Sequence, residues 1–140
     1  MNQEVARNIL LNHSRSSKNG IFPATATHAA KITNPFCGDH IELQLYVRDK
    51  VIYELGFKAA ACAICSASVS ILCQEIKGQS IESTLDSCQL FETAITEIDT
   101  PWPEALSSFQ CFEHLKINHS RRVCALLPWV ALKSALKKPI

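Results

Sequence analysis

The sequence predicts an α+β fold in which a small antiparallel β-sheet of about three strands has helices packed mainly on one face. Residues 41–48 alternate apolar and polar side chains, and the strand-like run 51–57 follows a tight turn at Asp49-Lys50, which together are typical of a β-hairpin. Longer stretches on both sides of this hairpin carry apolar residues at helical spacing. Two strands alone are unstable unless something packs on their apolar face, and the helical stretch 62–77 that follows is suited to cover them.

Size and composition predict one globular domain over residues 1–140. Apolar residues make up 47% of the chain and charged residues 19%, a balance that belongs to folded rather than disordered proteins. The net charge is only +1, the aromatic fraction is 7%, and no basic stripe is present. We therefore expect no nucleic-acid binding.

The sequence also predicts a cytoplasmic protein without a membrane segment. The longest uncharged stretch, residues 59–74, is shorter than the roughly 20 apolar residues that span a bilayer. Residues 1–11 include Glu4 and Arg7 and lack the apolar core of a signal peptide.

Before the hairpin, residues 3–13 have helical periodicity, and a polar break over 14–20 ends in Asn-Gly. Residues 21–36, with two prolines, are expected to form an irregular connector. Strands are predicted at 41–47 and 51–57, joined by a tight turn at Asp49-Lys50.

The second half of the sequence is predicted to be helical. After the helix over 62–77, Gly78 stands at the expected C-terminal position. The further helices are expected at 80–87, 90–98 and 104–116, and from Leu127 onward, with Pro128 in the first turn of the last one.

Cysteines are the most informative residue type in this chain. There are seven, at positions 37, 62, 65, 73, 88, 111 and 124. An odd number without a signal peptide argues against a disulfide framework. We expect buried small apolar residues, metal ligands or reactive thiols instead.

Four residues of metal-binding type fall at predicted element ends, where loops converge. Cys37 and Asp39 precede the first strand, Cys62 lies between the second strand and the long helix, and Cys124 precedes the last helix. Three thiolates and a carboxylate satisfy tetrahedral zinc or one edge of an iron–sulfur cluster. The carboxylate is the more replaceable ligand. Spacing alone leaves open that the thiols are buried and unreactive, with Asp39 capping a turn.

Two other arrangements use the same cysteines. Cys62-x-x-Cys65 is formally a redox motif, although such motifs occur in a βαβ context that the predicted antiparallel hairpin does not supply. A Cys2His2 zinc site is also compatible with ligand gaps found in structural sites; its members would be Cys111, His114, His119 and Cys124. Cys65, Cys73 and Cys88 are otherwise expected to pack in the core.

Four ordered segments resemble the successive signatures of the IscU/NifU scaffold family. They are Asn34-Pro35-Phe36-Cys37-Gly38-Asp39, Cys62-Ala63-Ile64-Cys65-Ser66-Ala67-Ser68, Ile76-Lys77-Gly78, and the run from Arg121 to Trp129. Together they cover roughly residues 5–135. The resemblance is closest to the SufU type, because Val123 stands where IscU-type proteins generally carry a histidine, and because the stretch between Gly78 and Cys124 is long.

The resemblance implies a SufE/NifU-like fold and a metal site made of Cys37, Asp39, Cys62 and Cys124. It implies zinc there, and a sulfur acceptor or relay that receives persulfide sulfur from a SufS/IscS-like cysteine desulfurase, with Cys37 and Cys124 as candidate acceptors. Downstream iron–sulfur assembly or acceptor proteins would be further partners.

Two alternatives to sulfur relay stay open. The chain would act as a scaffold that assembles a [2Fe-2S] cluster at the same four residues, or as a structural zinc-binding adaptor. Both a sulfurtransferase accessory to a desulfurase and a non-enzymatic scaffold are compatible with the sequence. The chain departs from the family at Ala59-Ala60-Ala61, where glycines are usual and alanine predicts a stiffer loop.

Overall fold

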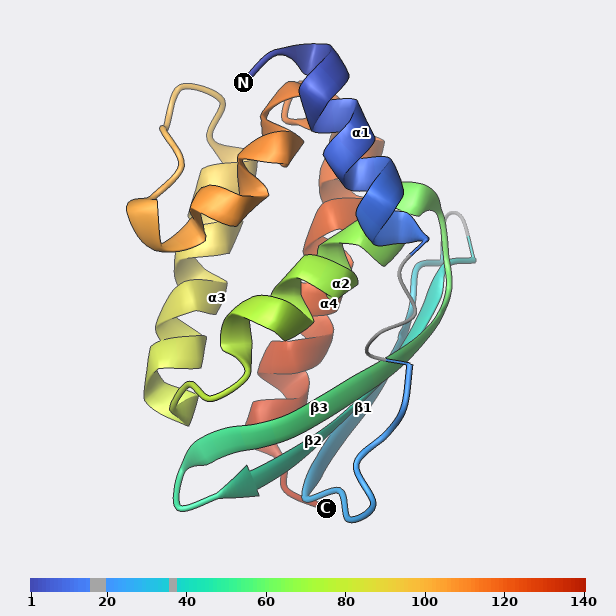
Figure 1. Cartoon of the computed structure of the whole chain (residues 1–140), viewed down its shortest axis with the longest axis vertical. Helices are drawn as coiled ribbons and strands as arrows, with labels where there is room; N and C mark the ends of the chain where they lie inside the picture. The colour runs from blue at the N-terminus through green and yellow to red at the C-terminus, as the bar shows by residue number, and fades with distance from the viewer. Residues whose placement is uncertain (16–19, 36–37) are drawn as a thin grey trace.

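The computed structural model describes residues 1–15, 20–35 and 38–140 and has the predicted α+β architecture (Figure 1). Three antiparallel strands form one sheet in the order β1-β2-β3, and the helices gather on one side of it. Helix α4 packs against β1 and β2, while α2 packs against β3. In chain order the elements are α1 (Gln3–Ser14), β1 (His28–Thr33), β2 (His40–Arg48), β3 (Val51–Ala60), α2 (Ala63–Ile76), α3 (Ile81–Thr96), η1 (Glu104–Leu115) and α4 (His119–Lys137).

The predicted hairpin is confirmed as β2 and β3. Asp49 and Lys50 both have positive φ, as a tight turn between antiparallel strands requires. The alternation that predicted the strands places Ile41, Leu43 and Leu45 fully inside the core. The pairing continues to the other end of the hairpin, where His40 lies opposite Ala60.

Strand β1 corrects the prediction that residues 21–36 form an irregular connector. Its six residues pair with β2 along their whole length, ending with Thr33 opposite His40. Only two of its apolar side chains, Ala30 and Ile32, pack against the core, and both are only partly buried. So short a pattern gives no clear period of two; the strand is defined by its backbone pairing with β2.

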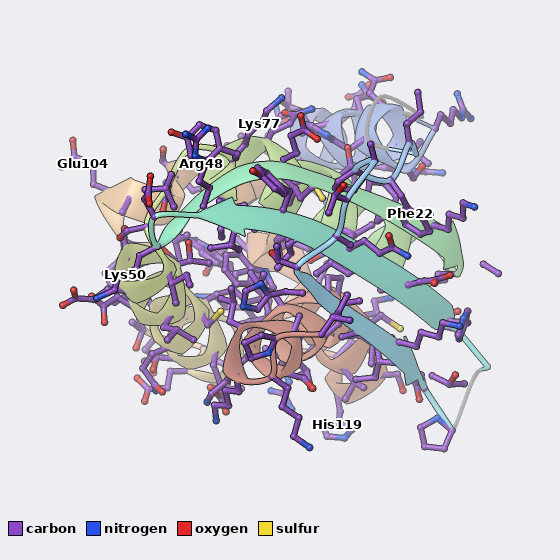
Figure 2. The ribbon with its side chains drawn as sticks, turned by 90° about the horizontal axis from the view of Figure 1, so that it is seen from below. Phe22, Arg48, Lys50, Lys77, Glu104 and His119 are labelled. Carbon is purple, nitrogen blue, oxygen red and sulfur yellow. The ribbon has the colours of Figure 1, made fainter. Side chains whose placement is uncertain are left out.

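The segment before β1 crosses the outer face of the sheet, where Gly56 is required for the close approach. A Cβ atom at Gly56 would collide with the carbonyl oxygen of Ile21. Beside this crossing, the Lys58 ammonium lies 4.7 Å from the centre of the Phe22 ring. Phe22 is labelled in Figure 2. This contact is a cation–π pair that holds the crossing segment down.

Helices α1 and α2 match their predictions closely. Helix α2 is the central element, because α1, α4, β3 and η1 all pack against it. It is consequently buried around most of its circumference. Its polar residues find partners: Ser68 donates a 2.6 Å hydrogen bond to the Ala125 carbonyl of α4, and the Ser70 hydroxyl lies 3.1 Å from Nδ1 of His13 on α1.

Helix α3 is continuous, so the predicted division into helices at 80–87 and 90–98 is wrong. Thr84, Cys88, Phe91 and Ile95 are all buried, and their spacing continues one apolar stripe across the expected break. The stretch predicted over 104–116 forms η1, a 3₁₀ helix with non-helical dihedral angles at Leu106.

Helix α4 also differs from the prediction, since it begins at His119 rather than near Leu127. The Asn118 side chain caps it by accepting a 3.1 Å hydrogen bond from the Arg121 N–H. Pro128 lies in the interior of the helix, where it has no N–H to donate to the carbonyl four residues earlier, at Cys124. Pro128 is buried, and packing on the sheet and on α2 offsets that lost bond. Cys124 therefore lies within a helix, not before one.

An aromatic cluster fills the space between α3, η1 and α4. The Phe91 ring stacks on Trp129 at 4.7 Å between centroids, and Phe109 packs edge-on against both rings. Such pairs stabilise a core beyond the area that they bury. Among the described residues, no helix is long and apolar enough to cross a membrane.

Candidate metal centre

The sheet register brings Asp39 and Cys62 together. Because His40 pairs with Ala60, the chain enters β2 and leaves β3 at the same end of the sheet. There the Cys62 N–H donates a 3.0 Å hydrogen bond to Oδ1 of Asp39. Two residues that are 23 positions apart in the sequence are thus fixed side by side by strand pairing.

Two backbone hydrogen bonds hold the Asp39 region from its other side. The Asn34 N–H donates to the Asp39 carbonyl at 2.7 Å, and the Gly38 N–H donates to the Asn34 carbonyl at 2.8 Å. Gly38 has a φ of 75°, a left-handed conformation that glycine adopts without strain. The glycine of the Cys-Gly-Asp segment is therefore needed for the turn that aims Asp39 at α2.

Cys62 is the N-cap residue of α2. Its Sγ accepts a 3.5 Å hydrogen bond from the Cys65 N–H, and its side chain is exposed. The N-terminus of a helix carries a partial positive charge that favours negative groups nearby. The capping bond fixes the Cys62 sulfur at the start of α2.

Cys124 completes the cluster from the second turn of α4, where it is half-buried. One carboxylate oxygen of Asp39 and the two sulfur atoms of Cys62 and Cys124 all lie within 4.8 Å of one another. Three elements that are remote in sequence thus place two soft donors and one hard donor around one point. No other such group of histidine, cysteine or acidic residues occurs within 1–15, 20–35 and 38–140.

The arrangement fits a metal ion. Asp39 is buried, and its Oδ2 atom has no hydrogen-bond partner among the residues that the structure describes. A buried carboxylate oxygen without a partner is costly, and a cation would satisfy it. Two sulfurs and one oxygen supply three of the four ligands that zinc takes in tetrahedral sites.

The fourth predicted ligand, Cys37, lies outside the described residues. Of the four predicted ligands, the structure therefore brings three together: Asp39, Cys62 and Cys124. The assignment of all four residues as ligands stays a prediction.

The remaining described cysteines are buried, as expected for thiols that pack in the core. Cys65 and Cys73 are fully enclosed, and Cys88 and Cys111 nearly so. Burial raises the pKa of Cys88 to about 12 and that of Cys111 to about 11, and it raises the pKa of Cys73 further still. These thiols stay protonated at neutral pH.

The two competing arrangements gain no support from the structure. Cys111 directs its thiol at the Ser108 carbonyl, 3.6 Å away, and the described residues contain no cluster that joins it to His114 and His119. Cys65 is inaccessible beneath Cys62, and the sheet is antiparallel, so a thioredoxin-like redox motif does not match this fold.

The alanines that replace the usual glycines before Cys62 fit without strain. Ala59 and Ala60 continue β3, and among the described non-glycine residues only Asp49 and Lys50 have positive φ. This backbone therefore does not need glycine.

Fold and cluster together define a class: a small α+β domain with two cysteines and a buried carboxylate gathered at one end of its sheet as a candidate metal centre. The model of the NifU-like N-terminal domain family matches residues 6–138, so the chain belongs to that family, which includes the IscU and SufU proteins.

The similar proteins include members of both the SufU and the IscU types. The chain is 26% identical to the zinc-dependent sulfurtransferase SufU of Bacillus subtilis, over 94% of this chain and 89% of that protein. It is 31% identical to the iron–sulfur cluster assembly scaffold protein IscU of Thermotoga maritima, over 90% and 87% of the two chains.

Solved structures agree with the fold. A SufU described as a cluster assembly scaffold of the SUF system, from Fervidobacterium islandicum, superposes with a TM-score of 0.85 at 25% identity, covering 91% of this chain and 93% of that one. A NifU-like N-terminal domain from Brucella abortus has a TM-score of 0.86 at 18% identity over 97% and 96% of the chains. The latter match shows the fold alone.

Proposed function

We propose that this protein acts in iron–sulfur cluster assembly as a sulfur acceptor or relay, with zinc held by Cys37, Asp39, Cys62 and Cys124. The observation that carries the proposal is the convergence of Asp39, Cys62 and Cys124 around one point, with a buried Asp39 oxygen that lacks a partner. The SufU relative is named as a zinc-dependent sulfurtransferase. A compartment that keeps thiols reduced, the cytoplasm, suits exposed cysteines of this kind.

In this proposal the cysteines hold the metal firmly, and Asp39 is the ligand that can leave it. Zinc, when bound, would keep the cysteine ligands as thiolates at neutral pH. Asp39 is the hard ligand and so the replaceable one. Its Oδ1 accepts the Cys62 N–H, so the carboxylate would keep a hydrogen-bond partner if it left a bound metal. This bond would lower the free-energy cost of opening the site.

The transfer itself is a thiol–persulfide exchange. A thiolate of this chain, Cys37 or Cys124, attacks the outer sulfur of the persulfide on a cysteine desulfurase. A new sulfur–sulfur bond forms as the old one breaks, and the desulfurase cysteine leaves as a thiolate that takes up a proton. No external oxidant or reductant is needed.

Assembly of a [2Fe-2S] cluster at the same residues is the second candidate. Two features favour it: thiolates also ligate iron–sulfur clusters, and several relatives are named as IscU scaffolds. A structural zinc adaptor is less consistent with the donor set, because purely structural zinc sites close with cysteine and histidine rather than with a carboxylate.

Desulfurase turnover separates these functions. Sulfide release by the cysteine desulfurase of the same organism should rise when this protein is added, and Cys37→Ala or Cys124→Ala should abolish the increase, since each removes a candidate acceptor. Cys73→Ala, deep in the core, is the matched control and should retain it. Unchanged turnover with Cys37→Ala and with Cys124→Ala, while the desulfurase still binds, would rule out sulfur relay.

The scaffold is tested by anaerobic reconstitution with iron and sulfide. A stable coloured cluster with equal amounts of iron and sulfide would favour assembly on this protein. Zinc that resists displacement under the same conditions would favour the relay.

A further inference from the structure

A pocket of about 250 Å³ lies beside the candidate metal centre. One face of α1 forms one wall, the first turn of α2 another, and the end of η1 and the start of α4 close it. Ala63 and Ile64, which line it, directly follow Cys62 in the sequence, and Arg121 stands one helical turn before Cys124. The pocket therefore adjoins the first turns of the two helices that carry Cys62 and Cys124.

The floor of this pocket is apolar. Ala6, Cys111 and Leu115 are buried residues that line it. The Cys111 thiol donates a hydrogen bond to the Ser108 carbonyl and stays protonated, so it adds no charge. This floor is suited to a small aliphatic group.

The rim is basic. Arg7, His114 and Arg121 line the pocket with exposed side chains, and none of the lining residues is acidic. Within the described part of the chain, neither arginine forms an ion pair. The N-terminus of α2 at the same wall adds its partial positive charge. Two unpaired guanidinium groups over an apolar floor are suited to receive a carboxylate attached to an aliphatic residue.

We propose that this pocket is the anchor point for the sulfur-donating protein, and that it receives an acidic side chain with an aliphatic neighbour from that partner. The inference rests on the proposed function, because it takes the donor to be a cysteine desulfurase. The pocket volume suits one or two side chains, not a helix. The position of the pocket places the anchor next to the thiols that the donor must reach, and the basic rim supplies the complementary charge.

Charge reversal at Arg7 tests the proposal. Arg7 is exposed on α1 and belongs to no metal ligand set, so Arg7→Glu should leave folding and metal content unchanged. The dissociation constant for the desulfurase should rise about tenfold or more, because loss of a close charge pair at an interface costs at least about 1.4 kcal/mol. The matched control is Arg48→Glu at the hairpin end of the sheet (Figure 2), which should change binding by less than about twofold.

Kinetics and salt sharpen the test. The concentration of this protein that gives half-maximal sulfide release should rise with Arg7→Glu, while the maximum at saturation stays the same, since Arg7 is not a sulfur acceptor. Added salt should weaken binding of the wild type more than that of the variant.

Three results would overturn the inference, and they are distinguishable. Wild-type binding with an unchanged dissociation constant for Arg7→Glu refutes the anchor and leaves the proposed function standing. A wild type that neither binds nor stimulates the desulfurase refutes both. A wild-type dimer that Arg7→Glu dissociates would assign the pocket to a second copy of this chain.

Discussion

The described cysteines belong to two regions with opposite environments. Cys62 caps the start of α2 and Cys124 lies in the second turn of α4, at the end of the sheet where the buried carboxylate of Asp39 meets them. Cys73, Cys88 and Cys111 lie inside helical elements with their thiols in the core. The same side chain thus serves as a candidate ligand in one region and as a small apolar residue in the other. Cys65, three residues after Cys62, is also fully buried, so access to the end of the sheet beside Asp39, rather than residue type or position in a helix, separates the two roles.

The largest expected difference between the two regions is in thiol reactivity. In the metal-free protein at pH 8, iodoacetamide should modify Cys62 more than about a thousandfold faster than Cys88. Cys88 is buried, and burial raises its pKa to about 12, so about one molecule in ten thousand carries the thiolate at that pH. Time-resolved peptide mass spectrometry measures both rates. Equal modification rates at Cys62 and Cys88 would contradict the division into a reactive and a buried group of thiols.

The next effect is on metal affinity. Cys62→Ala removes one ligand of the candidate centre and should weaken zinc binding by at least about a hundredfold, since even the loss of a residue that only orients a ligand costs about 10- to 100-fold. Cys73→Ala should bind zinc as the wild type does. Competition with a chromogenic chelator gives both affinities. Equal weakening by the two substitutions would mean that the metal effect arises from global destabilisation.

Alkaline pH should destabilise the core region selectively. The pKa values of Cys88 and Cys111 are raised from about 9 to about 12 and about 11, so above pH 9 the unfolded chain releases these protons while the folded chain retains them. Stability is therefore complete below about pH 9 and decreases above it, by about 1.4 kcal/mol per pH unit for each such thiol. Urea unfolding at a series of pH values measures the slope, and Cys88→Ala should reduce it. A slope that this substitution leaves unchanged would show that other groups titrate.

The smallest effect concerns the support of the metal-centre region. Asn118→Ala removes the cap of the helix that carries Cys124 and should lower the free energy of unfolding by about 1 kcal/mol. Zinc should still bind, because the packing of α4 on the sheet holds Cys124 in place. Thermal unfolding followed by circular dichroism provides the measurement. A loss of zinc with Asn118→Ala would mean that the cap itself positions the ligand.

Elements with a clear period were predictable from the sequence, and those fixed by distant contacts were not. The β2–β3 hairpin and α2 followed from the spacing of apolar side chains. Strand β1 was missed because only its pairing with β2 makes it a strand. The start of α4 was misplaced because Pro128 is typical of a first turn, whereas here it is buried in the helix interior.

The candidate site was predictable only in part, because its residue types are visible in the sequence but its geometry depends on distant contacts. The residues at positions 39, 62 and 124 could be selected from residue type and from resemblance to a family. Spacing alone could not reject Cys111 as a ligand, because the direction of its thiol depends on how η1 packs. The partnerless oxygen of Asp39 depends on the strand register and on the loop before β2, which no local pattern specifies.

Metal analysis of the protein as isolated, before any reconstitution, tests the central claim most directly. The claim predicts about one zinc per chain, bound through sulfur and oxygen in the X-ray absorption spectrum, and lost when Cys62 and Cys124 are both replaced by alanine. A protein isolated without zinc, or one whose metal persists in that double variant, would contradict it.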